Sequence, residues 1–237
     1  MPPPAADAPC PEQAFNATAL KWYTCAWLLL PVLVFLAGWM HWYAALPLTL
    51  LTAAGLAPRK RKEPQTRDSL PAFPLFTRSS FLALAAFAAL MALSGWGEWV
   101  NQHPDHIVRN ACLRELVASP WPVIFPDGNV LIYNTGFWLV PALAGKLAGL
   151  DAARVLVVLW GAWGLFLTWL WLCVFSGRRS LLLALLMAAF GSLLNFQCWL
   201  GLDLFRLHYF GTAEQIMCSA NASIPVLLFF IFLASGR

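Results

Sequence analysis

Ionisable and polar side chains gather within twelve residues of a chain that is otherwise strongly apolar. They are Glu98, Gln102, His103, Asp105, His106 and Arg109. A carboxylate such as Asp105 can act as a general base or hold a divalent cation, and an arginine such as Arg109 can neutralise a phosphate. The residue types therefore suit proton transfer, cation binding or phosphate binding at one place in the chain.

The residues after Pro104 predict a short amphipathic helix that lies on a membrane surface. Asp105 can cap free backbone amides, and apolar residues recur after it at helical spacing. Asp105 and Arg109 are one turn apart, as are His106 and Asn110, so we expect these polar groups on one side. The opposite side, facing lipid or other helices, would carry Val108, Cys112 and Leu116.

A purely structural role is the competing interpretation of this segment. Asp105 would be only a helix N-cap, Arg109 its partner four residues later, and His106 a solvated imidazole. On the chemical interpretation, Asp105 is the catalytic candidate, and Arg109, His106 and Gln102 are the candidate substrate-binding residues. Asp105 and Glu98 are the candidate ligands of a divalent cation, although the spacing of the two acids is not diagnostic.

The composition indicates a protein of the membrane. Hydrophobic residues make up 60% of the chain and charged residues 11%, which excludes a water-soluble globule that must cover itself in polar side chains. Between Lys21 and Arg59 there is no charged residue. That stretch far exceeds the roughly 20 residues of one crossing, so we expect a break near residues 38–42. The prediction is a helical hairpin of residues 22–39 and 43–57.

Further apolar runs predict an all-α, polytopic transmembrane helical bundle of about six spans. The later spans are expected at 80–96, 155–176, 181–200 and 224–237. Residues 131–149 are apolar but contain Asn134, Pro141 and Lys146, so they form either a short crossing or an interfacial helix. The last run ends about a dozen residues after it begins, which suggests a fragment or a truncated relative of a longer protein.

The basic residues predict the orientation of the bundle. Those of the first large loop are Arg59, Lys60, Arg61, Lys62, Arg67 and Arg78. Such a juxtamembrane cluster belongs in the cytoplasm, where anionic lipids attract it, so the net charge of +4 is no sign of nucleic-acid binding. The Pro/Ala-rich tail of residues 1–20 is then cytoplasmic, and the 97–130 loop with Asp105 is external. Arg178 and Arg179 mark a second cytoplasmic loop.

A second polar concentration follows in the loop at 201–224, on the same predicted side. His208 in this loop is a further candidate substrate-binding residue, if the loop lines the same cavity. The alternative, favoured because external loops are normally polar, is a solvated connector between two spans.

The order of these features resembles the membrane-embedded GT-C class of glycosyltransferases, which take sugars from polyprenyl-phosphate donors. In that class an outward helix leads to an external loop with an essential acid and small helices. An aromatic segment and a long span ending in a basic turn follow. The corresponding residues here are 94–97, 105–110, 131–149 and 153–179. Over residues 80–200 the chain is also similar to an uncharacterised group of bacterial polytopic membrane proteins.

The resemblance implies a transferase of the bacterial inner membrane, with Asp105 as catalytic base or cation ligand. Its partners would be membrane lipid and a polyprenyl-phosphate-linked sugar, transferred to an extracytoplasmic acceptor. The chain departs from the pattern at Pro126-Asp127-Gly128-Asn129, where many members have a phosphate-binding basic residue. The spans that close the donor groove in the class are also missing.

Two other functions compete with the transferase. One is a non-enzymatic scaffold or transporter component, and the other is an inactive fragment of a longer glycosyltransferase. The near absence of charge within the expected spans disfavours an ion-coupled carrier, which needs titratable groups near the bilayer midplane. The chain has no P-loop, H-E-x-x-H or G-x-S-x-G motif, so ATPase, zincin and serine-hydrolase functions have no starting residue.

Overall fold

The computed structural model describes residues 17–56, 77–100, 102, 104–133, 135–189 and 224–229. Regular structure in these residues is helical, which confirms the all-α prediction for this part of the chain. The named helices are α1 (Ala17–Trp39), α2 (Trp42–Leu56), α3 (Arg78–Leu93), α4 (Pro104–Ala118), α5 (Gly136–Ala148), α6 (Leu150–Ser176) and α7 (Leu181–Ala189). His208 and most of the 181–200 and 224–237 segments lie outside the described residues.

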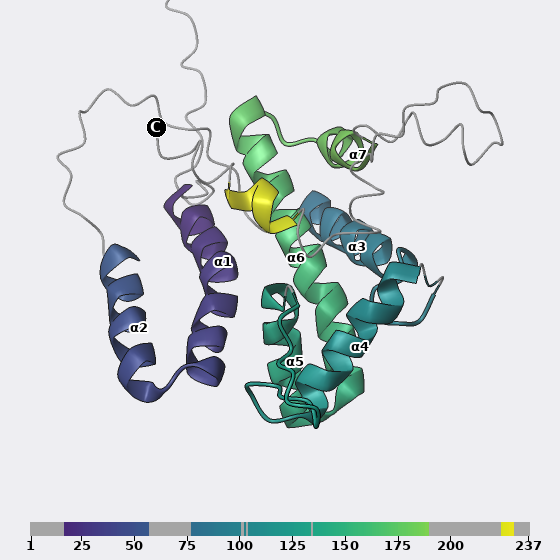
Figure 1. The fold of residues 1–237 in the computed structure, drawn as a ribbon. Coiled ribbons are helices and arrows are strands. Elements are labelled where there is room, and N and C mark those ends of the chain that lie inside the picture. The colour runs from purple at the N-terminus through teal and green to yellow at the C-terminus, as the bar shows by residue number, and fades with distance from the viewer. Residues whose placement is uncertain are drawn as a thin grey trace, which may run out of the picture.

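Helix α6 is the central element of the fold. Its 27 residues extend over about 40 Å, and α1, α3, α4, α5 and α7 all contact it. Figure 1 shows α6 between α1 and α3, with α5 beside its first half. Trp169, Trp171 and Leu165 of α6 are fully buried, so its aromatic residues pack inside the bundle.

The helices α1 and α3 run antiparallel to α6. The indole of Trp171 donates to the hydroxyl of Thr24 at 2.9 Å, and the indole of Trp27 donates to the carbonyl of Trp160 at 3.1 Å. These contacts bring the start of α1 to the end of α6. Arg179 donates to Ser80 in the same way, so α3 also starts beside the end of α6.

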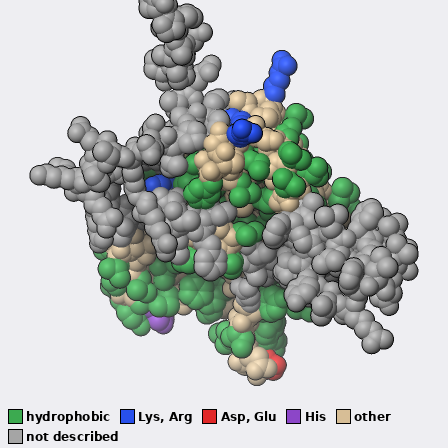
Figure 2. Space-filling model, turned by 90° about the horizontal axis from the view of Figure 1, so that it is seen from above, with side chains coloured by type: hydrophobic (Ala, Val, Ile, Leu, Met, Phe, Trp, Pro, Cys, Tyr) green, Lys and Arg blue, Asp and Glu red, His purple; other side chains and the backbone are tan. Residues whose placement is uncertain are grey.

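One end of the bundle is therefore basic. Arg78, Arg178 and Arg179 lie there together with the start of α1, and we call it the basic end. Figure 2 looks onto this end and shows basic side chains beside apolar ones. Three segments lie at the opposite end, which we call the α4 end: helix α4, the start of α6, and the turn that follows α3 (Figure 1).

Two helices in the described part are long and apolar enough to cross a membrane. They are residues Ala19–Trp39 and Leu150–Ser176. The predicted hairpin is present, because α1 ends at Trp39 and α2 begins at Trp42. The described residues do not confirm the expected six spans, since α2, α3 and α5 are apolar but shorter.

Several expected segments differ in extent from the prediction. Helix α1 begins at Ala17 and not at residue 22, and α6 begins at Leu150 and not at residue 155. Helix α3 ends at Leu93 and not at residue 96, because Gly95, Gly97 and Glu98 have φ angles of 95°, 91° and 68°, which a right-handed helix cannot contain. Within 131–149, only Gly136–Ala148 is helical. Its 13 residues extend over about 20 Å, so α5 is too short to cross a bilayer by itself.

Candidate functional site

The turn that follows α3 positions two side chains in opposite ways. Its positive φ angles at Gly95, Gly97 and Glu98 reverse the chain over a few residues. Trp96 points inward, where it contacts the rings of Phe137 and Trp138 on α5 at centroid distances of 5.5 and 6.3 Å. Glu98 points toward α4 and α6. The turn thus provides a buried aromatic ring on which α5 packs and a carboxylate that faces α4 and α6.

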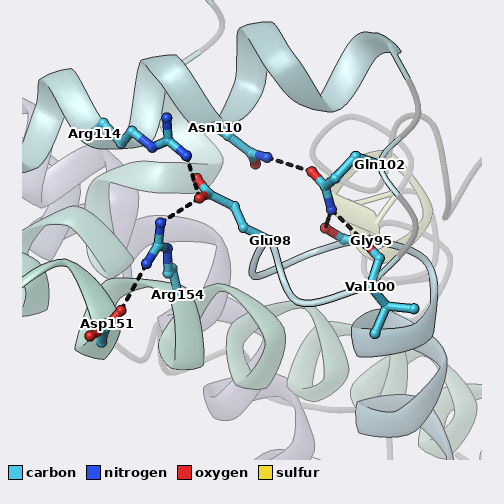
Figure 3. A network of polar contacts seen from close by, with 8 residues as sticks. All are labelled: Gly95, Glu98, Val100, Gln102, Asn110, Arg114, Asp151 and Arg154. Atoms are coloured by element: carbon cyan, nitrogen blue, oxygen red, sulfur yellow. Dashed lines mark hydrogen bonds and ion pairs between the residues drawn. The ribbon is translucent and has the colours of Figure 1, made fainter.

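Glu98 is the centre of an ion-pair network that joins three segments (Figure 3). Its Oε2 lies 2.5 Å from Nη2 of Arg114 on α4 and 2.5 Å from Nη2 of Arg154 on α6. Arg154 also donates to Asp151 at 2.8 Å. Burial alone raises the pKa of Glu98, but hydrogen bonds and charge from Arg114 and Arg154 outweigh it and lower this pKa overall. Glu98 therefore stays ionised and holds α4 on α6.

This arrangement does not suit the cation-ligand role considered for Glu98. Two guanidinium groups already share one of its carboxylate oxygens, and their positive charges oppose the approach of a divalent cation. The residues that the structure describes contain no group of three or more His, Cys, Asp or Glu side chains arranged to hold a metal ion.

Gln102 ties the turn to α4. Its amide nitrogen donates to the carbonyls of Gly95 and Val100, at 2.9 and 2.7 Å. Its amide oxygen accepts a hydrogen bond from Asn110 at 2.7 Å (Figure 3). Both ends of the amide are therefore engaged within the protein, which favours a structural role over the expected substrate contact.

Helix α4 forms as expected, from Pro104, but its faces differ from the expected ones. The buried face holds His106, Arg109, Cys112, Leu113 and Leu116, which recur at helical spacing. Asp105 and Val108 are exposed. As expected, Asp105 and Arg109 share one side of α4, and Cys112 and Leu116 face the bundle. The expectation that Val108 shares the side of Cys112 and Leu116, and that His106 and Arg109 lie on a separate polar side, is wrong, because α4 packs through His106 and Arg109 onto Trp96.

Trp96 is the common contact of His106 and Arg109. The His106 ring lies 5.5 Å from the Trp96 ring between centroids, and the guanidinium carbon of Arg109 lies 5.8 Å from it. The second distance is that of a cation–π contact. Cys112, one turn further along the buried face, has its pKa raised by burial to about 12, so its thiol stays protonated and acts as an apolar side chain.

Arg109 and Asp105 form the expected pair across one turn of α4, but it is a loose one. Nη2 of Arg109 and Oδ2 of Asp105 are 3.6 Å apart, beyond hydrogen-bond length. Nε and Nη1 of Arg109 are buried and have no hydrogen-bond partner. The side chain of Asp105 is 52% exposed, whereas that of Arg109 is 9% exposed. The carboxylate of Asp105 is therefore accessible to solvent, whereas the guanidinium of Arg109 is enclosed.

The structure brings Asp105, His106 and Arg109 together on the first turns of α4. His208 lies outside the described residues. Sequence reasoning missed the roles of Arg114 and Arg154, which neutralise Glu98. Their one signal in the sequence is position: Arg154 directly precedes the apolar span expected at 155–176, and Arg114 lies in the external loop expected before it. A charge beside an apolar helix needs a partner.

Comparisons with protein-family models, with curated proteins and with solved structures find no match to this chain.

Proposed function

We propose that the chain is a multi-pass protein of the bacterial inner membrane, with a cytoplasmic N-terminus. The support is the difference in charged residues between the two ends of α6. Arg178 and Arg179 follow its end, and Glu98, Asp151 and Arg154 form ion pairs at its start. Basic residues that flank membrane helices favour the cytoplasm. The basic end would then be cytoplasmic, and the α4 end would be external.

The remaining spans of a bundle of about six would come from shorter or partly described segments. These are α2, α3 and the stretches at 181–200 and 224–237, which are apolar in sequence. Helix α5 would lie within the outer half of the bundle without crossing. This arrangement keeps α4 and the turn before it on one side of the membrane.

For this external region we propose the chemistry of a GT-C-like transferase. A sugar would move from a polyprenyl-phosphate donor in the bilayer to an extracytoplasmic acceptor, with Asp105 as the general base. The observation that carries the proposal is the half-exposed carboxylate of Asp105 in the first turn of α4, beside the buried Arg109 on the same side of the helix. A base at the edge of a packed helix face is open to a substrate.

The reaction balances with Asp105 as proton acceptor. The acceptor hydroxyl loses its proton to the Asp105 carboxylate while its oxygen bonds to the anomeric carbon of the sugar. The bond between that carbon and the donor phosphate oxygen breaks, and the polyprenyl phosphate leaves with the electron pair. Catalysis by a positioned base of this kind contributes about 10²- to 10⁴-fold to rate.

The experiment uses a bacterial host in which loss of the full chain removes an extracytoplasmic glycan. Asp105→Asn keeps the size of the side chain and removes the base, so we expect glycan to fall about 100-fold or more at unchanged protein level. Glu115→Gln is the matched control, because Glu115 is another acid of α4 and its carboxylate bonds to Ser119. Wild-type glycan in the Asp105→Asn strain would rule out the transferase.

A scaffold is the second candidate function, and α2 favours it. Among the described helices, α2 has its main contacts with α1, and it exposes Trp42, Tyr43, Leu50 and Leu51. Such a surface fits a neighbouring membrane helix as well as lipid. A scaffold predicts that changes on α2 abolish the glycan or its assembly while Asp105→Asn leaves it intact.

A further inference from the structure

Three arginines of the α4 end differ in how closely an acid neutralises their charge. Arg114 and Arg154 each lie 2.5 Å from the same carboxylate oxygen of Glu98. Arg109 has Asp105 as its ion-pair partner, at 3.6 Å, and that carboxylate is half exposed. Since an ion pair weakens with distance and with solvent around it, Arg109 is the least neutralised of the three.

Arg109 is also the most enclosed of the three. Its side chain is 9% exposed, against 54% for Arg114 and 23% for Arg154. Two of its nitrogens, Nε and Nη1, are buried without a hydrogen-bond partner. Burying a charged donor without a partner costs free energy, and buried polar groups in native proteins almost always have one. The Trp96 ring stabilises the charge but accepts no conventional hydrogen bond from these N–H groups.

We propose that Arg109 binds an oxyanion, and that the oxyanion is the phosphate group of a membrane lipid. A guanidinium donates several hydrogen bonds in one plane, which matches phosphate oxygens. The lipid source follows from the exposed apolar side chains of Ile107 and Val108, which belong to the same turn of α4 as Arg109, although Arg109 faces the bundle. Apolar residues on an interfacial helix enter the headgroup region, where lipid phosphates lie.

The neighbouring charges allow an anion at this position. Glu98 is paired with two arginines, so its negative charge is largely cancelled. Asp105 is the ion-pair partner of Arg109, but the pair is loose at 3.6 Å and the carboxylate is half exposed to solvent, which screens its charge. The inference rests on the membrane location under Proposed function, but it does not rest on transfer of a sugar.

The test measures lipid binding to the purified full chain in detergent micelles by native mass spectrometry. The probe is dioleoyl phosphatidic acid, and the reference is dioleoylglycerol, which has the same acyl chains and no phosphate. We expect wild-type protein to prefer phosphatidic acid by about tenfold or more, as a few charge-assisted hydrogen bonds provide. Equal binding of the two lipids by wild-type protein overturns the proposal without any variant.

Two variants with a matched control assign the site. Arg109→Gln should abolish the preference for phosphatidic acid, and Arg109→Lys should weaken it, because lysine keeps the charge but lacks the planar set of donors. Arg178→Gln is the control, because it removes the same charge from an exposed arginine at the basic end, away from α4 and from the Glu98 network. Its preference should stay at the wild-type level. An unchanged preference in both Arg109 variants, or an equal loss in Arg178→Gln, overturns the assignment.

A competition arm identifies the source of the phosphate. Inorganic phosphate at millimolar concentration should leave phosphatidic acid binding unchanged, and displacement by it would overturn the lipid source in favour of a soluble anion. The result of the lipid-binding test can be distinguished from the result of the glycan test of the transferase. If Asp105→Asn leaves the glycan intact while the phosphatidic acid preference depends on Arg109, the transferase fails and the oxyanion site stands.

Discussion

Oε2 of Glu98 and Nη2 of Arg154 lie 2.5 Å apart, although 56 residues separate them in the chain. Arg114 reaches the same oxygen from α4. One carboxylate therefore joins the turn after α3, the amphipathic helix α4 and the central helix α6. Because α4 also carries Asp105 and Arg109, the position of the candidate site depends on this acid.

Glu98→Gln should destabilise the protein. The amide keeps the shape of the side chain but leaves two guanidinium groups without their shared carboxylate. Because Glu98 is 9% exposed but Arg114 is 54% exposed, losing the shared carboxylate should cost about 1 to 3 kcal/mol. Thermal unfolding in detergent, followed by circular dichroism, measures the change. Asp151→Asn is the control, because Asp151 is 91% exposed and its pair with Arg154 should contribute about 0.5 kcal/mol or less. Equal melting temperatures of Glu98→Gln and wild type would contradict the prediction.

The same ion pairs predict a pH dependence of stability. The pKa of Glu98 is lowered from its ordinary value of 4.5, so folding favours the ionised carboxylate. The stabilisation is therefore present above pH 4.5 and is lost as pH falls through the lowered pKa. Between about pH 6 and pH 3, wild-type protein should lose more thermal stability than Glu98→Gln, which has no carboxylate there to titrate. Parallel losses in the two proteins would assign the acid sensitivity to other groups.

Gly145 and Gly136 of α5 should respond differently to alanine. A Cβ at Gly145 would lie 2.5 Å from Val117 of α4 and 2.8 Å from Ala153 of α6, so the three helices must separate. Gly145→Ala should cost about 1 to 3 kcal/mol of unfolding free energy. A Cβ at Gly136 meets nothing within 4 Å, so Gly136→Ala should be neutral or slightly stabilising. Similar melting temperatures for the two variants would contradict the close packing of α5 on α4.

The proposed orientation predicts which end of α6 a membrane-impermeant thiol reagent reaches. In a background whose six cysteines are replaced by alanine, Asp151→Cys and Arg178→Cys mark the two ends of this helix. A maleimide that cannot cross the inner membrane should label Asp151→Cys in intact spheroplasts, and Arg178→Cys only after permeabilisation. The reverse labelling would put α4 and Asp105 on the cytoplasmic side and remove the basis of the transferase proposal.

The sequence alone was sufficient for features that depend on neighbouring residues. The charge-free stretch after Lys21 and the break before Trp42 predicted α1 and α2, because a long apolar run must turn where polar and aromatic groups permit it. Pro104 with Asp105 predicted the start of α4, and the apolar run expected at 155–176 predicted the end of α6. Each of these features is governed by local backbone and capping preferences, which a short stretch of sequence contains.

The tertiary structure decided which face of α4 is buried and which charges meet. Polar and apolar residues alternate around α4, so spacing allowed either Val108 or Arg109 to face the bundle, and the contact with Trp96 selected Arg109. The partners of Glu98 come from two helices that are distant along the chain. Such pairings depend on how helices pack against each other, and local periodicity carries no information about them.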